Sequence, residues 1–334
     1  MVRIVFRIEG NNRLGMGHTF TPLRIAKKLV SEKGIKRKDL LFIMSSESKR
    51  GQDIVKVENY IVVEIDDVEE QVSAIKKFNP NFVFTDVLHA DVEYMKLLRQ
   101  NRIFTINMEH SEKTETRNLA NVVINSLYPD KNPGAEYHYG PRYALLSDSY
   151  ANLHIRKINR KCKRVFVCFG GSDANSLTIK AVKALMNYNV KVDVVVIPNP
   201  KVEEELQELY LDKNKYILHK EIKDSSELML NADIGIVSGG YTCYECAATG
   251  LPIIVLSQND LEHHRNSTVF VKYGTCVYLG YGTKISEHKL GKEIEKIMND
   301  YNLRTEMSKK GQELVDGKGL DRVVDIILSK AVHK

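Results

Sequence analysis

The chain repeats one pattern along its whole length: short runs of β-branched and aromatic residues alternate with longer stretches in which apolar residues recur at helical spacing. Such alternation is typical of a parallel sheet covered by helices on both faces. The short runs are almost continuously apolar, as in Val165–Phe169, which is expected of strands buried on both faces. The sequence therefore predicts an α/β protein built from doubly wound, Rossmann-like domains.

The pattern pauses once and then restarts. The turn-rich segment Tyr128–Gly134 and the polar, basic stretch 147–164 separate two halves of similar size. We place the boundary near residue 155, with domains at 1–154 and 155–334, and with the last helix free to pack back on the first domain. Ligands of doubly wound sheets bind beyond the carboxyl ends of the strands, so we expect the binding site in a cleft between the domains.

Predicted elements of each half have the following bounds. In the first half, strands are expected at Ile4–Ile8, Leu40–Met44, Ile61–Ile65, Phe82–Thr85 and Ile103–Asn107, and helices at His18–Glu32, Val68–Phe78 and Asp91–Asn101. In the second half, strands are expected at Val165–Phe169, Val192–Ile197, Tyr216–His219, Ile234–Val237, Ile253–Leu256 and Cys276–Leu279. Helices are expected there at Ser176–Asn187, Val202–Leu211, Ser225–Asn231, Thr242–Thr249, Leu261–Tyr273, Ser286–Asn299, Leu303–Asp316 and Leu320–Val332.

Length and composition agree with two domains. A chain of 334 residues suggests two domains at about 100–200 residues each, and 43% hydrophobic residues supply two cores. The net charge of +6 is mild, and basic clusters such as Arg160-Lys161 are short, so we expect no nucleic-acid partner. The positive balance would still help to attract a diphosphate.

The sequence also predicts a cytoplasmic protein without a membrane span. Its first residues are strand-like and do not form a signal peptide, and no apolar run approaches about 18 residues. Five scattered cysteines do not describe a disulfide framework, and Cys243-x-x-Cys246 lacks the second pair of a zinc site. We expect these two cysteines to pack in the core and expect neither metal nor cofactor. Oligomeric state is not readable from the residues.

The first candidate site lies between the first strand and the first helix, in the motif Arg13-Leu14-Gly15-Met16-Gly17-His18. The glycines Gly15 and Gly17 would permit a tight turn and close approach of a ligand, and Arg13 would face it. His18 at the helix start is expected to be a neutral imidazole, which suits a general base near pH 7. The alternative is a plain turn in which His18 only caps the helix.

Two further glycine turns follow strands of the second half. Gly170-Gly171-Ser172 comes after the first of these strands, and Ser238-Gly239-Gly240-Tyr241-Thr242 after the fourth. Backbone amides at such strand-to-helix turns form a cradle for phosphate. Glu245, one turn into the next helix, is positioned to accept bonds from ribose hydroxyls. Plain βα turns and a glutamate that complements the helix dipole remain alternatives.

Other polar residues also fall at strand ends. Asp86 is expected to bond a sugar hydroxyl or to cap a helix, and His263 or His264 to bond sugar or phosphate. Adjacent histidines on a helix point in different directions, so they are not expected to share a metal. Glu109 and His110 are weaker candidates.

These segments together resemble a known family. The motif at Gly15-x-Gly17-His18, the segment Gly140–Leu146, the turn in Val167–Thr178 and the segment Gly239–Pro252 occur in the same order as in the UDP-sugar hydrolases of pseudaminic acid biosynthesis and their relatives in spore-coat polysaccharide synthesis. That family is similar in fold to the GT-B glycosyltransferases, which include the enzyme that adds GlcNAc to a lipid intermediate of murein.

The resemblance implies the chemistry. It places a UDP-linked acetamido-deoxy sugar between the domains, with the UDP held by the second one. His18 matches the catalytic histidine and would activate water to attack the anomeric carbon, without a metal. Amides at the helix starts near Gly171 and Gly240 would stabilise the leaving diphosphate.

Two other functions stay open. The chain departs from the hydrolases at Glu9, Thr21, Glu109-His110 and His263-His264, and Pro22 is more like the glycosyltransferases. The runner-up is therefore an inverting glycosyltransferase in which His18 deprotonates an acceptor hydroxyl. The third possibility is a protein that binds a nucleotide-sugar without catalysis.

Overall fold

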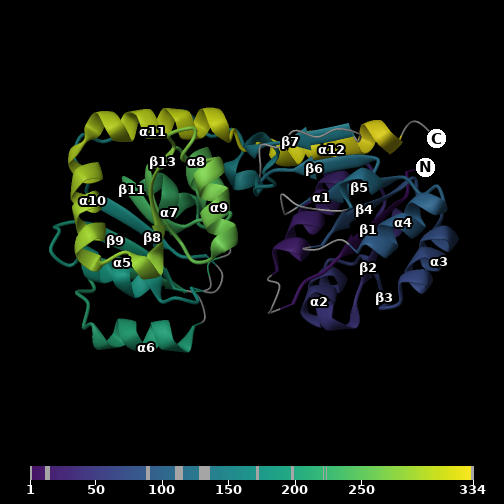
Figure 1. The fold of residues 1–334 in the computed structure, drawn as a ribbon, viewed down its shortest axis with the longest axis horizontal. Helices are drawn as coiled ribbons and strands as arrows, with labels where there is room; N and C mark the ends of the chain where they lie inside the picture. The colour runs from purple at the N-terminus through teal and green to yellow at the C-terminus, as the bar shows by residue number, and fades with distance from the viewer. Residues whose placement is uncertain are drawn as a thin grey trace. The chain divides into compact units, whose positions relative to one another are not determined.

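The computed structural model describes residues 2–11, 16–87, 91–109, 116–127, 136–170, 173–196, 199–220, 222 and 224–331. The chain forms two compact units (Figure 1). Unit 1 comprises Met1–Leu145 and Lys318–Lys334, and unit 2 comprises Leu146–Gly317. Each unit contains one parallel sheet with helices on both faces, which confirms the predicted pair of Rossmann-like domains.

Unit 1 has a seven-stranded sheet in the order β3-β2-β1-β4-β5-β6-β7, with all neighbouring strands parallel. The strands are β1 (Ile4–Ile8), β2 (Leu40–Met44), β3 (Ile61–Glu64), β4 (Phe82–Asp86), β5 (Thr105–Met108), β6 (Val122–Asn125) and β7 (Glu136–Tyr139). The helices are α1 (Gly17–Lys33), α2 (Lys49–Val57), α3 (Val68–Phe78), α4 (Val92–Gln100) and α12 (Gly319–Ala331).

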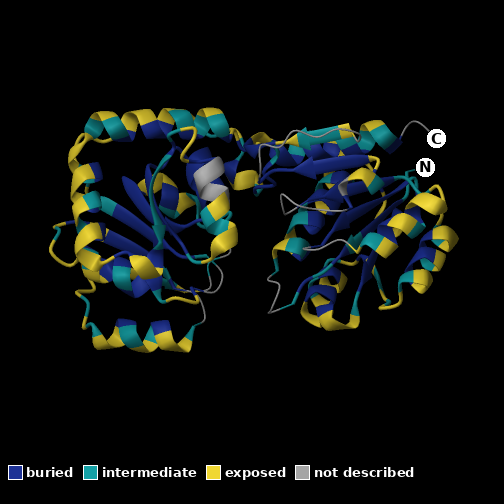
Figure 2. Ribbon diagram, viewed as in Figure 1, coloured by how far each residue is buried: buried dark blue, intermediate teal, exposed yellow. Residues whose placement is uncertain are grey.

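The central strands of this sheet are buried, as their dark blue colour in Figure 2 shows. Successive side chains of a strand point to opposite faces. Phe6 therefore packs toward α1 and α12, where its ring stacks on Phe42 with centroids 4.9 Å apart. Val5 packs toward α3 and α4 on the other face. Fixed on both faces, the sheet presents the ends of its strands as a rigid platform for polar side chains.

Helix α12 returns to unit 1 after the chain has completed unit 2. Its apolar residues Leu320, Val324 and Ile327 join the core beneath α1. On the surface of α1, Lys28 pairs with Asp321 at 2.7 Å. The last helix thus belongs to the N-terminal unit.

Unit 2 has a six-stranded parallel sheet in the order β10-β9-β8-β11-β12-β13. The strands are β8 (Arg164–Cys168), β9 (Lys191–Val196), β10 (Tyr216–Lys220), β11 (Ile234–Ser238), β12 (Ile253–Ser257) and β13 (Cys276–Tyr281). The helices are α5 (Leu177–Leu185), α6 (Pro200–Glu208), α7 (Ser226–Asn231), α8 (Thr242–Ala248), α9 (Asp260–Thr268), α10 (Glu287–Asn299) and α11 (Tyr301–Leu314).

The division between the units falls at Leu145–Leu146, earlier than the boundary near residue 155 that the sequence suggested. Residues just after the division are bound to unit 2. The Ser149 hydroxyl donates to Asp224 at 2.5 Å, and the Arg156 guanidinium donates to the carbonyls of Met229 and Thr249 at 3.0 and 3.2 Å. The two arginine bonds satisfy carbonyls that helices α7 and α8 leave open at their ends.

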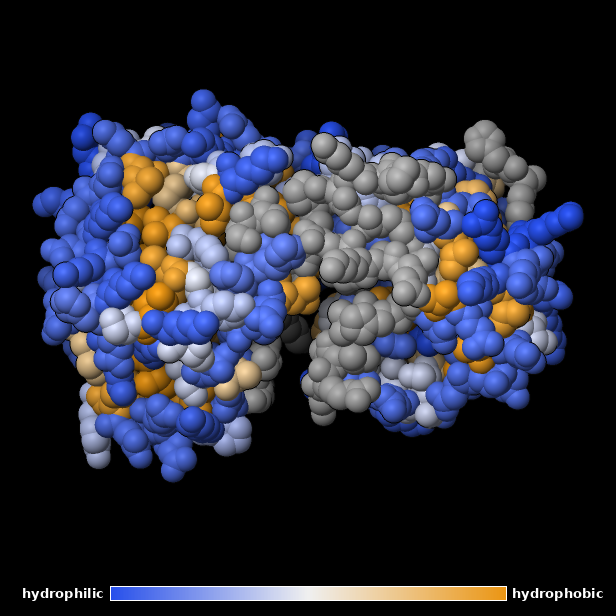
Figure 3. Space-filling view, in the orientation of Figure 1, coloured by the Kyte–Doolittle hydropathy of each residue, from blue (hydrophilic) through white to orange (hydrophobic). Residues whose placement is uncertain are grey.

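No helix in the described part of the chain is long and apolar enough to cross a membrane. Among the coloured residues of unit 2, hydrophilic ones predominate on the face that Figure 3 presents.

Candidate functional site

The candidate catalytic group of unit 1 is a histidine–aspartate pair at the carboxyl end of its sheet. His18 is the second residue of α1, and Asp86 is the last residue of β4. Nδ1 of His18 lies 2.8 Å from Oδ1 of Asp86, whose side chain is fully buried. An ionised carboxylate only accepts, so Nδ1 carries a proton and the lone pair of the neutral ring lies on Nε2. The pair is therefore arranged to take a proton through Nε2.

The first turn of α1 is held firmly against the end of β1. The Thr19 hydroxyl donates to the carbonyl of Glu9 at 3.0 Å. A Cβ on Gly10 would lie 1.9 Å from that hydroxyl oxygen, so only glycine permits this approach. The amide of Gly10 is in turn bonded to the Ser48 hydroxyl at 3.1 Å. These contacts, which the sequence did not reveal, fix the position from which His18 reaches Asp86.

Asp86 changes the protonation expected of His18. Burial lowers the pKa of His18, but the hydrogen bond and charge of Asp86, with a smaller effect of Glu9, raise it by more, so that it lies above its usual 6.5. The sequence predicted a neutral imidazole favoured by the helix start, and it assigned Asp86 to a sugar or a helix cap. The pKa is shifted upward instead, because the effect of Asp86 exceeds that of burial. Asp91, not Asp86, caps the following helix α4, and a bond from Asp86 to a sugar hydroxyl stays a prediction.

A second buried polar group lies on the opposite face of the same sheet. The Glu109 carboxylate accepts from Asn125 Nδ2 at 3.0 Å and from the Tyr137 hydroxyl at 3.2 Å. Glu109 follows β5, whereas its partners lie on β6 and β7, two strands that the sequence did not predict. A buried carboxylate needs such partners. The sequence could not predict this network because it did not predict strands β6 and β7. His110 lies outside the described residues.

In unit 2 the two predicted glycine turns meet at the carboxyl ends of β8 and β11. Gly170 has a φ of +72°, and a Cβ there would lie 3.2 Å from the Ser238 hydroxyl oxygen. A Cβ on Gly240 would lie 3.8 Å from the same oxygen. The turns are neighbours because β8 and β11 are paired. Arg13, Gly15, Gly171 and Ser172, also assigned to the site by the sequence, lie outside the described residues.

The first amides of α5 are bonded to a side chain of the protein itself. The fully buried Asp173 carboxylate accepts from the amides of Leu177 and Thr178 at 2.8 and 3.0 Å. These are the first amides of α5, so the carboxylate already satisfies them. The amides of Gly171 and Ser172 lie outside the described residues, so a phosphate cradle at that turn stays a prediction.

The turn at Gly239–Gly240 is contacted by Glu262, a residue the sequence prediction passed over. One oxygen of Glu262 accepts from the amide of Gly239 at 3.2 Å and from the amide of Gln258 at 2.8 Å. Its other oxygen would lie 3.7 Å from a Cβ on Gly240. The Gln258 side chain donates to the carbonyl of Phe169 at 2.6 Å and so joins the ends of β12 and β8.

His263 is held by aromatic residues of β13. Its Nδ1 is bonded to the Tyr278 hydroxyl, and its ring stacks on Tyr281 with centroids 4.4 Å apart. Nε2 is thus the nitrogen oriented away from Tyr278. The neighbouring His264 is exposed on α9. The two imidazoles therefore have different surroundings, as the sequence suggested.

Helix α8 carries the remaining candidates. Thr242 is its first residue and is buried, whereas Tyr241 and Glu245 are partly exposed. Cys243 and Cys246 are buried in the core, where burial raises the pKa of Cys246 well above its usual value. Among the described residues no group of three or more His, Cys, Asp or Glu side chains is placed to hold a metal ion.

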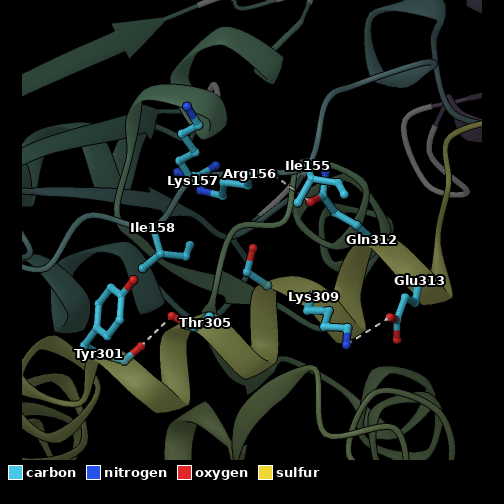
Figure 4. A pocket seen from close by; sticks show the side chains of 10 residues that line it. Ile155, Arg156, Lys157, Ile158, Tyr301, Thr305, Lys309, Gln312 and Glu313 are labelled. Carbon is cyan, nitrogen blue, oxygen red and sulfur yellow. Dashed lines mark hydrogen bonds and ion pairs between the residues drawn. The ribbon is translucent and has the colours of Figure 1, made fainter.

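A cavity of about 540 Å³ lies elsewhere in unit 2, between residues 155–158 and α11 (Figure 4). Its polar groups hold the chain segment in place. Gln312 accepts from the amide of Arg156 at 2.9 Å and donates to the carbonyl of His154 at 3.0 Å. The fully buried Arg304 donates to the carbonyls of Asn159 and Arg160 at 2.8 and 2.9 Å. These bonds anchor the segment 154–160 to α11.

Comparison with known proteins supports a glycosyltransferase-like chain. Residues 164–320 match the model of the glycosyltransferase family 28 C-terminal domain. The chain is 26% identical over 334 residues to the spore coat polysaccharide biosynthesis protein SpsG of Bacillus subtilis, with 96% of each chain covered. It is 28% identical over 281 residues to the uncharacterized protein MJ1062 of Methanocaldococcus jannaschii, with 78% of this chain and 57% of that protein covered. The chain thus spans little more than half of MJ1062.

The fold is similar to that of MurG from Acinetobacter baumannii, with a TM-score of 0.76 at 17% identity over 98% of this chain and 99% of that one. At that identity the likeness concerns the fold. The chain has the GT-B fold, and residues 164–320 are similar to the glycosyltransferase family 28 C-terminal domain.

Proposed function

We propose that this protein transfers a sugar from a nucleotide-activated donor, and that the His18–Asp86 pair is its general base. The observation that carries the proposal is the 2.8 Å bond between His18 Nδ1 and the buried Asp86 carboxylate at the carboxyl end of the sheet. This bond directs the lone pair of the ring to Nε2 and raises the affinity of the ring for a proton.

The reaction balances in one displacement. An acceptor hydroxyl oxygen forms a bond to the anomeric carbon while the bond from that carbon to the diphosphate oxygen breaks. His18 Nε2 takes the hydroxyl proton, and the electron pair leaves with the nucleoside diphosphate. Asp86 stabilises the imidazolium that forms and keeps the ring oriented. Attack from the face opposite the leaving group inverts the anomeric configuration.

Unit 2 is proposed to hold the donor nucleotide. The match to the family 28 C-terminal domain covers the two glycine turns and α8. Gly239 and Gly240 would bind the diphosphate, Thr242 would assist, and Glu245 would accept from the ribose hydroxyls. UDP is the nucleotide that the family resemblance implies. Tyr241, His263 and His264 are proposed to border the sugar and the base.

Hydrolysis, the reaction that the sequence favoured, uses the same pair with water in place of the acceptor. The comparisons favour transfer, because the matching family model is that of a glycosyltransferase. The similarity to SpsG, which is named as a spore coat polysaccharide biosynthesis protein, supports a saccharide as the acceptor. A role in pseudaminic acid synthesis has no support from these relatives.

The experiment is a measurement of UDP release from UDP-linked acetamido sugars, with and without mono-, oligo- and lipid-linked saccharides as acceptors. Transfer predicts that one acceptor class accelerates release and that the sugar appears on it. Release that no acceptor accelerates, with oxygen-18 from water recovered in the free sugar, would instead establish hydrolysis. Oxygen-18 in the UDP would mean attack at phosphorus and would contradict both.

A further inference from the structure

The anion-binding turn of unit 2 already holds an anion, supplied by the protein itself. The amides of Gly239 and Gln258 come from the ends of neighbouring strands β11 and β12, and both point at one carboxylate oxygen of Glu262, at 3.2 and 2.8 Å. Paired backbone amides that converge on one oxygen are a recurrent way to bind phosphate or carboxylate. A phosphate oxygen and the Glu262 oxygen are acceptors of the same kind.

We infer that Glu262 is a placeholder for the donor diphosphate: its carboxylate occupies the Gly239 and Gln258 amides in the ligand-free protein, and a phosphate oxygen displaces it. The inference rests on the proposed function, because it concerns the nucleotide site of unit 2. It adds a residue that controls which anions gain access to that site.

The arrangement satisfies the backbone in both states. Half-buried amides that lose water need an acceptor whether or not ligand is bound. Glu262 lies in the first turn of α9, and its amide is itself capped by Asn259 Oδ1 at 2.9 Å. The side chain can thus turn away from the amides while its backbone stays anchored.

Displacement has a consequence for specificity. Every anion that enters must compete with an acceptor tethered beside the amides, which has a high effective concentration. A small anion gains little beyond these two bonds. A nucleoside diphosphate gains additional contacts, so it overcomes the competition more readily than free phosphate or pyrophosphate does.

The test compares wild type, Glu262→Gln and Glu262→Asp in the full chain. Glutamine keeps the length but loses the charge, whereas aspartate keeps the charge but is one methylene too short to reach both amides. Calorimetric titration with UDP and with inorganic pyrophosphate should give dissociation constants lower than wild type by roughly threefold to tenfold in both variants. The constant for uridine, which has no phosphate, should not change.

Asp260→Asn is the matched control. It removes the same charge from the same turn of α9, but Asp260 is exposed and bonds the Tyr281 hydroxyl at 2.5 Å. It should change the affinity for UDP by no more than about twofold, because exposed charges are screened. If the affinity for UDP rises in Glu262→Gln and Asp260→Asn but not in Glu262→Asp, the cause is a general charge effect. The inference that Glu262 is a placeholder would then be wrong.

The remaining outcomes separate the two proposals. If wild type binds UDP and both Glu262 variants bind it equally or more weakly, the placeholder is wrong and the nucleotide site stands. If neither wild type nor any folded variant binds UDP or pyrophosphate, both are wrong. Circular dichroism verifies folding, and the amide resonance of Gly239 should move in Glu262→Asp and, on addition of UDP, in wild type.

Discussion

Among the residues that the structure describes, each unit contains a hydrogen-bonded histidine–aspartate pair with the same nitrogen–oxygen distance. In unit 1, His18 Nδ1 lies 2.8 Å from Asp86; in unit 2, His219 Nε2 lies 2.8 Å from Asp193. Both aspartates are fully buried. The two pairs differ in where the aspartate lies along its strand and in which other side chains are bonded to it. Asp86 ends β4, whereas Asp193 is the third residue of β9 and also accepts from the Arg164 guanidinium at 2.9 Å.

On these differences we propose the His18–Asp86 pair as catalytic and the His219–Asp193 pair as structural. Ligands of parallel sheets bind at the carboxyl ends of strands, where only the Asp86 pair lies. Asp86 is bonded to His18, whereas Asp193 is bonded to both His219 and Arg164. A hydrogen-bonded histidine and aspartate do not by themselves make a catalytic base.

Replacement of the two histidines by alanine is the strongest way to break the comparison. His18→Ala removes the proposed base and should lower kcat by about a hundredfold to ten-thousandfold without loss of fold. His219→Ala is the matched control and should leave kcat per folded molecule unchanged. UDP release and thermal melting give both readouts. Equal kcat values in the two variants would remove the catalytic assignment of His18.

Asp86→Asn tests how the carboxylate acts through His18. Asp86 raises the pKa of His18 above 6.5, and the base must be unprotonated to work. In wild type, kcat/KM should therefore fall as the pH drops through a value above 6.5. In Asp86→Asn the charge is gone and burial dominates, so this limb should move to lower pH, while kcat falls by up to about 10⁴-fold. A limb that stays in place would show that Asp86 does not set the protonation of His18.

Much of the fold could be predicted because the strands are short and strongly apolar. The bounds of β1, β2 and α3 agree with the expected Ile4–Ile8, Leu40–Met44 and Val68–Phe78. Strand β7 was missed because its sequence, Glu-Tyr-His-Tyr, mixes charged and aromatic residues at the edge of the sheet, where burial on both faces is not required.

The sequence predicted where the glycine turns of the candidate site lie, but not which side chains form hydrogen bonds with the site residues. Glycine turns after strands point to the ends of β8 and β11, and the structure brings them together. The hydrogen-bond partners could not be predicted, because Asp86 lies 68 residues from His18 in the chain, and Glu262 lies 23 residues from Gly239. Which carboxylate reaches which group depends on strand order, which local patterns do not contain.

Asp193→Asn tests whether the His219–Asp193 pair of unit 2 stabilises the fold. Burial raises the pKa of Asp193, but Arg164 and His219 lower it by more, so the pKa lies below the ordinary 3.8. The ionised Asp193 carboxylate therefore stabilises the folded state fully above pH 3.8, and this stabilisation is lost as the pH falls through the lowered pKa. Asp193→Asn should reduce the free energy of unfolding by about 2 kcal/mol at neutral pH, because the partners are partly exposed. Urea denaturation measures this, and kcat per folded molecule should not change.

The smallest effect is expected at Gly17, beside the catalytic pair. Gly17 opens α1, and a Cβ there would meet no described atom within 4 Å. Alanine favours helix over glycine, so Gly17→Ala should leave the melting temperature unchanged or slightly raised. If a ligand approaches this backbone as closely as the sequence predicts, the added methyl should raise the KM for the donor or acceptor roughly fivefold. An unchanged KM would mean that the space beside His18 is not used by substrate, and the difference between the two histidine–aspartate pairs would then rest on kcat and its pH dependence alone.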